Sequence, residues 1–333
     1  MKIQVSELEA TVVAGVEKLG YTGEEARIIA DVLLYAQLRG NNQGISKIAT
    51  GGVPKADAVA PFRVVTETKC GALLSGGHSM VASVRAADKA VDLARTHGVG
   101  VVASNNTRTS SGSIGYFARR IADAGYIALV TVANGGWAAV APFGSAEPKL
   151  GTNPLAYAFP YDGGAVVFDT ATAAAAYYGV VEAMLKGEPL PEGVGLNALG
   201  EPTTNAAEVL GTGDGEAVGG ALTTFAGHKG FGLSLLVQLL GSAFALAGFP
   251  GGHEEDGAGT FVLAIDPGLL AGTDEYLTRS RELIDSIRSA KPIAGQRVSL
   301  PGERGDAIAA EAERTGEIEI ADAIWNELVR FVS

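Results

Sequence analysis

Apolar residues recur at helical intervals in the amino-terminal part of the chain and predict two amphipathic helices. Ser6 with Glu9, and Thr22 with Glu25, have the spacing of a capping box, which favours a helix start at each pair. Gly40 is placed to end the second helix. The apolar positions are Leu8, Val12, Val16 and Leu19 in the first helix, and Ile29, Val32, Leu33 and Ala36 in the second.

From about residue 78 the pattern alternates between helices and strands. It predicts a helix over Met80–His97 that stops at Gly98, a strand over 99–103, a polar loop over 104–113, a helix over 116–124 and a strand over 127–132. Buried strands that alternate with helices are typical of an α/β fold with some parallel strand pairing.

The second half of the chain contains more glycine and is less regular. A short strand over 166–168 is predicted to end at the turn 169–172, and a helix over 173–186 follows it. Residues 187–219 are expected to be irregular. Two late helices, over 277–288 and 321–329, are expected to pack onto the amino-terminal pair.

Composition excludes several classes of protein. With 333 residues, 47% hydrophobic and 19% charged, the chain can bury a large core, and two connected lobes are expected. The net charge of -12 argues against nucleic acid or an anionic membrane as a partner. Cys70 is the only cysteine, so an internal disulfide is impossible and a multi-cysteine metal site is excluded. The start of the chain does not resemble a signal peptide, and a cytoplasmic location is expected.

A lysine lies inside a glycine-rich loop, Gly227-His228-Lys229-Gly230, which is followed by an apolar segment over 233–246. A helix that starts at such a loop directs free N–H groups and its positive dipole end toward an anion, and Lys229 adds a full charge. A phosphate-bearing cofactor suits this arrangement. An exposed lysine in an ordinary helix-entry turn is the alternative interpretation.

The usual dinucleotide fingerprint does not occur in its required context. Gly98-Val99-Gly100-Val101-Val102-Ala103 matches it by letters, but the glycines precede a strand instead of following one. A Rossmann domain is therefore not expected. The run His253-Glu254-Glu255-Asp256 is interpreted as a solvated loop and not as a metal site, because four adjacent residues rarely converge on one ion.

Six segments, taken together and in order, resemble the type-2 malate/L-lactate dehydrogenase family of NAD(P)-dependent oxidoreductases, which includes sulfolactate and ureidoglycolate dehydrogenases and piperideine-2-carboxylate reductase. The resemblance covers nearly the whole chain. The segments are Gly76-Gly77-His78, Ala141-Pro142-Phe143-Gly144, Leu150-Gly151-Thr152-Asn153-Pro154, Phe168-Asp169-Thr170-Ala171-Thr172, Gly227-His228-Lys229-Gly230 and Leu300-Pro301-Gly302-Glu303-Arg304.

The resemblance implies an α/β fold of the non-Rossmann, sulfolactate-dehydrogenase-like type, with a mixed sheet and packed amino- and carboxy-terminal helices. It also implies a homodimer with its active site near the subunit interface. We expect a helical substrate and dimer lobe formed by 1–75 and 270–333, and a cofactor-binding α/β lobe over 76–269. The implied contacts to NAD or NADP are Asp169, Thr170, Ala171, Thr172, Ala173, His228, Lys229, Gly302 and Glu303.

The chain departs from the family at its catalytic segment. Typical members have a proton-transferring histidine where this chain has Gln43, and a carboxylate-binding arginine where it has Lys47. A second family histidine is absent from the loop 105–112. Glutamine cannot exchange a proton near neutral pH, and a lysine keeps the charge but loses the planar bidentate fork.

These departures lead to a hypothesis about the reaction. A ketone reduced by hydride needs a proton on its oxygen, to which a positioned acid contributes about 10²–10⁴-fold. A protonated imine already carries its proton. The missing histidine therefore indicates either a shift toward C=N reduction or another proton donor, for which Lys47, His78 and Asp169 are the candidates.

The predicted catalytic residues are Gln43, Lys47 and Asp169, and the predicted substrate contacts are Asn42, Lys47 and Arg108. The substrate is expected to be a small carboxylate with a carbonyl, hydroxyl or imine at C2. One alternative is a family member that binds the cofactor without catalysis, and another is a phosphate-ligand enzyme unrelated to redox chemistry. The sequence does not decide between NADH and NADPH.

Overall fold

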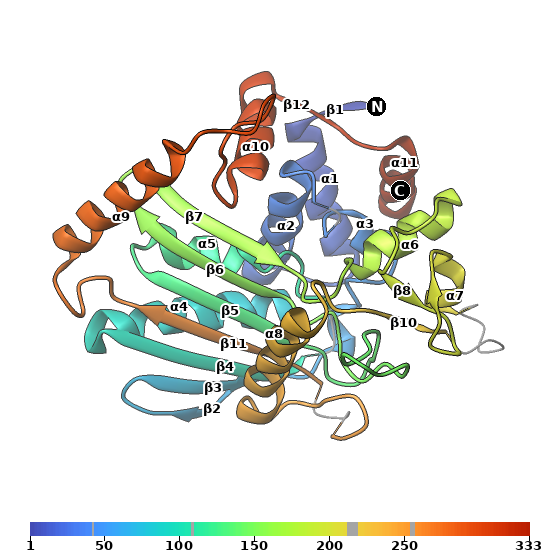
Figure 1. Ribbon diagram of the computed structural model, residues 1–333, viewed down its shortest axis with the longest axis horizontal. Helices are drawn as coiled ribbons and strands as arrows, with labels where there is room; N and C mark the ends of the chain where they lie inside the picture. The colour runs from blue at the N-terminus through green and yellow to red at the C-terminus, as the bar shows by residue number, and fades with distance from the viewer. Residues whose placement is uncertain (42, 108–109, 212–218, 254–256) are drawn as a thin grey trace.

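A seven-stranded mixed sheet forms the centre of the computed structural model, which describes residues 1–41, 43–107, 110–211, 219–253 and 257–333 (Figure 1). Strands β3 and β4 are parallel, and the other neighbouring pairs of this sheet are antiparallel. The mixed sheet predicted from the sequence is therefore confirmed. In spatial order the strands are β2 (Arg63–Glu67), β3 (Gly71–Ser75), β4 (Val99–Thr107), β11 (Ala258–Ile265), β5 (Ile127–Ala133), β6 (Leu155–Tyr161) and β7 (Gly164–Thr170).

Strand β11 separates two strands that follow one another along the chain. It pairs antiparallel with β4 on one side and with β5 on the other. A doubly wound nucleotide fold would instead place such consecutive strands side by side and parallel. The sheet order thus agrees with the prediction that this is not a Rossmann domain.

Helices cover both faces of the sheet. On one face α4 (Ser79–His97) and α5 (Gly115–Asp123) pack against the central strands, and α2 (Gly23–Leu38) and α1 (Val5–Lys18) form a further layer. On the other face lie α8 (His228–Gln238) and the π-helical segment η2 (Leu239–Phe244), as Figure 1 shows. The main core lies between the sheet and α4, α5 and α2.

The two ends of the chain meet. Strand β1 (Lys2–Gln4) pairs antiparallel with β12 (Glu317–Glu319), and α11 (Asp322–Val332) packs on α1 and on the short helix α3 (Ser46–Ala49). Helix α10 (Glu303–Thr315) contacts α2. The predicted packing of amino- and carboxy-terminal helices is therefore confirmed for these elements.

One late helix was assigned to the wrong neighbour. Helix α9 (Thr273–Arg288) packs on β6 instead of the amino-terminal helices, and the Tyr276 hydroxyl donates to the carbonyl of Pro160 at 2.9 Å. The contacts of α9 gather at the hairpin between β6 and β7, where Arg281 also pairs with Asp162 and Arg288 donates to the Tyr161 hydroxyl at 3.4 Å.

A smaller unit with its own core is built around α6 (Tyr177–Lys186) and includes buried residues both before and after this helix. The segment expected to be irregular contains short ordered pieces: β8 (Gly195–Leu196), β9 (Pro202–Thr203) and α7 (Ala206–Leu210), and β10 (Ala221–Leu222) completes a three-stranded sheet with β8 and β9. A 3-10 turn, η1 (Ala56–Ala58), precedes β2. The predicted boundary between the two lobes, at residue 75, coincides with the end of β3, and both β2 and β3 belong to the central sheet. The division into two lobes stays a prediction.

Several predicted ends of elements are corrected. Helix α1 begins at Val5 and not after Ser6, because the amide of Val5 donates to the carbonyl of Gly316 where β1 meets β12. Strand β4 continues to Thr107, into the predicted loop, because β11 pairs with it there. The helix expected from Ala173 begins at Tyr177, because Ala174 donates a backbone hydrogen bond to Thr223. Within the described residues, no helix has the length and apolar character needed to cross a bilayer.

Candidate active site

A cavity of about 850 Å³ opens at the end of β7, beside the start of α6. We call it the lysine cavity. It is bordered by Asn41, Gln43, Lys47, Gly52, Ser110–Ser113, Asn134–Trp137, Thr152–Pro154, Asp169–Ala171 and Ala173–Tyr178, among others. Its volume is in the range of small-molecule and cofactor sites.

Lys47 is completely buried in the wall of this cavity. Its ammonium nitrogen has no hydrogen-bond partner among the described residues and lies 3.7 Å from the centre of the Tyr178 ring. Burial lowers the pKa of Lys47 to about 7. A buried amine without an acidic partner is costly for folding, and an anion bound beside it would offset that cost.

The local chain explains how Lys47 reaches this position. Helix α3 is held against α1 and α11 by Ile48, which is buried. Gly52 lies against the Lys47 side chain, and a β-carbon at position 52 would come within 2.9 Å of the Lys47 Cβ. A glycine at position 52 therefore leaves room for the lysine stem.

Gln43 borders the same cavity as Lys47, as the sequence predicts. Its backbone N–H donates to the Asn41 side-chain oxygen at 2.9 Å. The other predicted substrate contacts, Asn42 and Arg108, lie outside the described residues, as do residues 254–256 of the acidic run.

None of the chain's four histidines borders the lysine cavity, and all four belong to the described part of the chain. His78 caps α4, where its Nδ1 accepts from the Met80 amide at 3.2 Å, and its ring lies edge-on to Tyr21. Burial lowers the pKa of His78 to about 3. The structure thus gives His78 a capping role and offers no geometry for the proton transfer considered for it.

Asp169 lies at the end of β7 and borders two cavities. Its Oδ2 accepts from the Ser113 hydroxyl at 2.7 Å and from the Gly115 amide at 2.8 Å. It therefore stabilises the start of α5, and not the start of the helix that follows it in the sequence. Burial raises the pKa of this carboxyl, and the two hydrogen bonds lower it in part.

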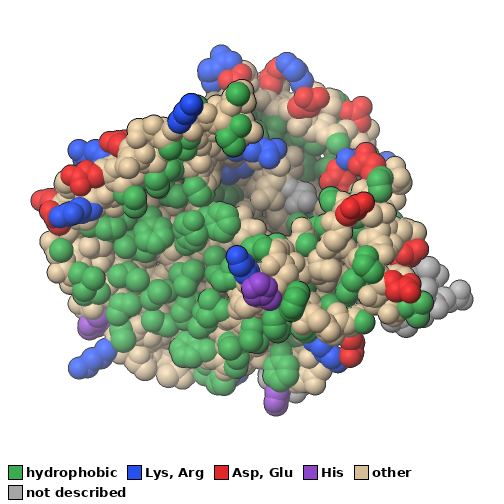
Figure 2. Space-filling model, viewed as in Figure 1, with side chains coloured by type: hydrophobic (Ala, Val, Ile, Leu, Met, Phe, Trp, Pro, Cys, Tyr) green, Lys and Arg blue, Asp and Glu red, His purple; other side chains and the backbone are tan. Residues whose placement is uncertain are grey.

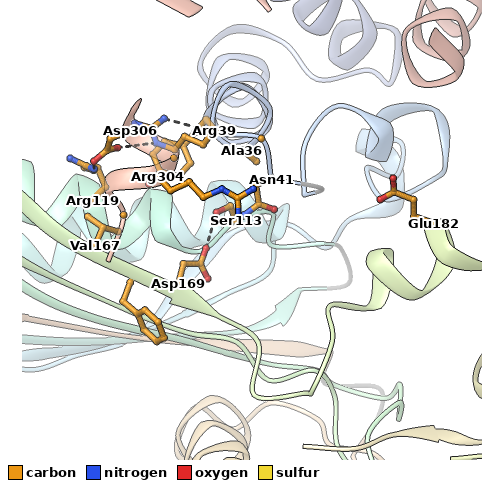
Figure 3. A pocket seen from close by; sticks show the side chains of 15 residues that line it. Ala36, Arg39, Asn41, Ser113, Arg119, Val167, Asp169, Glu182, Arg304 and Asp306 are labelled. Carbon is orange, nitrogen blue, oxygen red and sulfur yellow. Dashed lines mark hydrogen bonds and ion pairs between the residues drawn. The ribbon is translucent and has the colours of Figure 1, made fainter. Parts of the chain in front are cut away.

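The second cavity, of about 590 Å³, adjoins the first and shares Asn41, Ser113 and Asp169 with it. Figure 3 shows this arginine cavity, which lies between α2, α5, the end of β7 and the start of α10. Its remaining border is formed by Tyr35, Ala36, Arg39, Gly40, Arg119, Val167, Phe168, Glu182, Gly302, Arg304, Gly305 and Asp306.

The turn at residues 169–173, which we call the cofactor turn because its residues are predicted to contact NAD or NADP, borders these cavities only in part. Thr170, Ala171 and Ala173 border the lysine cavity. Thr172 does not, because it is buried and its hydroxyl donates to the carbonyls of Thr152 and Asn153 at 3.2 and 2.8 Å. Thr172 thus holds the turn in place.

His228 and Lys229 are exposed at the start of α8 and border neither cavity. The loop before them is nevertheless joined to the cofactor turn, because the Phe225 amide donates to the Thr172 carbonyl at 3.2 Å. Gly227, with φ of 60°, adopts a backbone conformation that suits glycine at the helix entry. The structure therefore brings two predicted cofactor segments together.

Gly302 and Glu303, the last two predicted cofactor contacts, differ in whether they border a cavity. Gly302 borders the arginine cavity and precedes α10. The Glu303 carboxylate accepts from Arg288 at 2.7 Å and from the Leu300 amide at 3.1 Å, and the hydrogen bond from Arg288 lowers its pKa. Glu303 therefore shapes the start of α10 instead of bordering the cavity.

Sequence reasoning missed three features of the site. Tyr178 was not singled out, although a pair of tyrosines at 177 and 178 follows a run of alanines. Asn153 has a buried side-chain oxygen without a partner in the described structure and borders the lysine cavity. The group Arg39, Arg119 and Asp306 is assembled from three separate helices, so no local motif marks it.

Known proteins resemble the chain over almost its whole length. The profile of the malate/L-lactate dehydrogenase family matches residues 3–329. L-sulfolactate dehydrogenase of Methanocaldococcus jannaschii is 31% identical over 329 residues, which cover 94% of this chain and 91% of that protein. A Δ1-pyrroline-2-carboxylate/Δ1-piperideine-2-carboxylate reductase of Pseudomonas putida is 31% identical over 327 residues, covering 91% of this chain and 89% of the reductase.

Solved structures agree with the fold. Sulfolactate dehydrogenase from M. jannaschii superimposes with a TM-score of 0.82 at 30% identity, covering 99% of this chain and 96% of the other. Δ1-piperideine-2-carboxylate reductase from Pseudomonas syringae gives 0.83 at 28% identity, with 99% of both chains covered. The predicted fold type and the general class of NAD(P)-dependent oxidoreductase are thus confirmed. The chain belongs to the malate/L-lactate dehydrogenase family.

Proposed function

We propose that this protein is a nicotinamide-dependent reductase that transfers a hydride to C2 of a small carboxylate, and that it prefers cyclic 2-imino carboxylates to 2-oxo acids. The observation that carries the proposal is the lysine cavity, in which a buried, unpaired ammonium is present and no imidazole borders the space. Location in the cytoplasm remains a prediction.

The two cavities suit a dinucleotide together with a small substrate. They measure about 590 and 850 Å³ and share Asp169 and Ser113, so an elongated ligand can extend from one into the other. Thr170, Ala171 and Gly302 would contact it along this path. When bound, the nicotinamide supplies or accepts the hydride, and the residues of the chain provide binding and orientation.

Lys47 is the substrate-binding group in this proposal. A substrate carboxylate next to its ammonium would offset the cost of the buried charge, and the attraction is strong because the site is buried. The carboxylate also raises the pKa of Lys47 from about 7, so the lysine is charged when substrate is bound. The Tyr178 ring, 3.7 Å from the ammonium, limits the directions in which the lysine can point.

The proton requirement favours an imine over a ketone. When hydride adds to C2 of a protonated imine, the C=N π electrons move to nitrogen, which keeps its proton, and the product is a secondary amine. A ketone needs a proton on oxygen as well, and Gln43 cannot donate one. Asp169 borders the cavity, but two hydrogen bonds already occupy its Oδ2. In this proposal the Lys47 ammonium is engaged by the substrate carboxylate and not by the reacting group at C2. The relatives act on both substrate classes by their names, sulfolactate for one and cyclic imines for the other.

A substrate panel tests this proposal. We expect NADH or NADPH oxidation, followed by absorbance, to be faster with Δ1-pyrroline-2-carboxylate and Δ1-piperideine-2-carboxylate than with pyruvate, oxaloacetate or 3-sulfopyruvate. Gln43→His should raise the rate with 2-oxo acids selectively, by up to about 10²-fold. Fast reduction of 2-oxo acids by the wild type, with slow reduction of imines, would contradict the preference. Cofactor binding without turnover on any substrate would favour a family member that no longer catalyses.

We further infer that the protein forms a homodimer through the face that carries α8 and η2, and not through the lobe of 1–75 and 270–333 in which the dimer contact was expected. Figure 2 shows apolar side chains over most of this face of the molecule. The exposed apolar residues of α8 and its continuation are Leu233, Leu235, Leu236, Leu239, Phe244, Leu246 and Phe249. Soluble monomers rarely expose an apolar surface of this extent, and a second copy of the chain presents the same surface for an isologous contact.

A further inference from the structure

Three arginines, Arg39, Arg119 and Arg304, and three carboxylates border the arginine cavity, and the arginines are concentrated at the start of α10. Arg39 and Arg119 both pair with Asp306, so this group of three keeps one net positive charge. The Arg39 guanidinium is also stacked 3.8 Å from the centre of the Tyr35 ring, which holds it at the cavity wall. Arg304, which also borders the cavity, adds a further positive charge.

Arg304 has no hydrogen bond or ion pair with the described residues. Figure 3 shows its side chain extending into the cavity in the direction of Asn41 and Ser113. Its neighbour Glu303 does not neutralise it, because the Glu303 carboxylate is paired with Arg288 and does not border the cavity. Arg304 therefore presents a free guanidinium to a ligand.

The carboxylates that border the arginine cavity are already engaged. Asp306 is paired with two arginines. Asp169 accepts from Ser113 and Gly115. Glu182 is paired with Lys186 at 2.6 Å. In Rossmann-fold enzymes a carboxylate accepts a hydrogen bond from the ribose 2′-hydroxyl of NAD, whereas an arginine accommodates the 2′-phosphate of NADP. The same chemistry of a 2′-hydroxyl and a 2′-phosphate applies to a nicotinamide cofactor in another fold. Among the described residues, this cavity offers the arginine and no free acid.

We propose that the arginine cavity binds the 2′-phosphate of NADP(H) and that Arg304 determines a preference for NADPH over NADH. The inference rests on the proposed function, because it takes the ligand of this cavity to be the nicotinamide cofactor. The planar guanidinium matches two phosphate oxygens, and the net positive charge of the Arg39, Arg119 and Asp306 group favours the same dianion.

Binding of two nucleotide fragments that lack the nicotinamide tests this directly. We expect calorimetry to show that 2′,5′-ADP binds the wild type at least tenfold more tightly than 5′-ADP. Arg304→Ser should weaken 2′,5′-ADP binding by about 10- to 100-fold and leave 5′-ADP unchanged, because a hydrogen bond to a charged group contributes about 1.5–3 kcal/mol. The ratio of kcat/KM for NADPH to that for NADH should fall by the same factor.

Arg314→Ser is the matched control, because Arg314 lies at the other end of α10, is exposed and pairs with Glu311. This variant removes the same charge from the same helix, and it should leave the affinities for 2′,5′-ADP and 5′-ADP unchanged. Arg304→Lys should retain part of the preference. Equal affinities of the wild type for the two fragments, or equal loss of both in Arg304→Ser, would overturn the proposal. The proposed function would still stand if the wild type turned over its substrate with NADH. Failure of every adenine nucleotide to bind would overturn the proposed function as well.

Discussion

Replacement of Lys47 by methionine separates the cost of a buried amine from its use in binding. Lys47 is completely buried, and its ammonium nitrogen has no partner among the described residues. Methionine has a similar length and no charge, so Lys47→Met removes the amine with little change in packing volume. We expect this variant to be more stable than the wild type near neutral pH and to be poor at binding carboxylates.

The size of the effect follows from the pKa of Lys47. Burial moves it from 10.5 to about 7, which corresponds to about 5 kcal/mol. Because the pKa is lower in the folded state than in the unfolded state, the unfolded chain binds the proton more readily between these two values. The cost is therefore complete below about pH 7 and disappears as the pH rises above about 10.5. Between pH 7 and pH 9 it falls from about 4 to about 2 kcal/mol.

Urea unfolding at pH 7 and pH 9, at one fixed protein concentration, measures this change. The free energy of unfolding of Lys47→Met should exceed that of the wild type at pH 7, and the excess should be smaller by about 2 kcal/mol at pH 9. Lys55→Met is the matched control, because Lys55 is exposed. The free energy of unfolding of this variant should differ from that of the wild type by the same amount at pH 7 and at pH 9. A difference between Lys47→Met and wild type that does not change with pH would refute the reasoning.

The same amine should couple carboxylate binding to proton uptake. At pH 8 the free enzyme carries Lys47 mostly uncharged, since its pKa is about 7, and a bound carboxylate raises that pKa. Calorimetry with oxamate and cofactor in two buffers of different ionisation enthalpy should therefore show proton uptake by the wild type. Uptake of the same size by Lys47→Met would exclude Lys47 as its source.

Two further predictions concern the capping histidine and the dimer face. His78→Ala should lower the free energy of unfolding by at least about 1 kcal/mol, whereas His78→Asn should retain most of the cap. Neither should change the pH profile of kcat, because the pKa of His78 is about 3, and a shifted profile would restore it as a proton donor. Leu239→Arg should convert the dimer to a monomer in light scattering, whereas Leu270→Arg, at a position 95% exposed, should not, and an unchanged dimer in Leu239→Arg would move the interface elsewhere.

Local patterns predicted the elements whose signals are local. The helix over Met80–His97 was expected to stop at Gly98, and α4 does end there, with Gly98 at φ of 79°. The position of β11 could not be predicted in this way. It comes more than a hundred residues after β5 yet lies between β4 and β5, and its choice of partners depends on contacts that no periodicity encodes.

The same distinction holds within the site. Asp169 lies shortly before a predicted helix in the sequence, yet the amide from which it accepts a hydrogen bond belongs to Gly115, 54 residues earlier, at the start of a different helix. The burial of Lys47 could not be predicted from the sequence either, because it depends on the packing of α3 against helices from both ends of the chain. Resemblance to a family identified the position, and only the fold reveals its environment.

The two departures from the family pattern become related once they share a cavity. Gln43 and Lys47 were interpreted from the sequence as two separate losses, of an acid and of a bidentate fork. In the structure both border the lysine cavity, and Lys47 is the buried cation of that space. An arginine at this position stays charged at all working pH values, whereas a lysine with a pKa of about 7 responds to its ligand. A site without histidine therefore keeps one titratable group beside the substrate, and its charge depends on whether a carboxylate is bound.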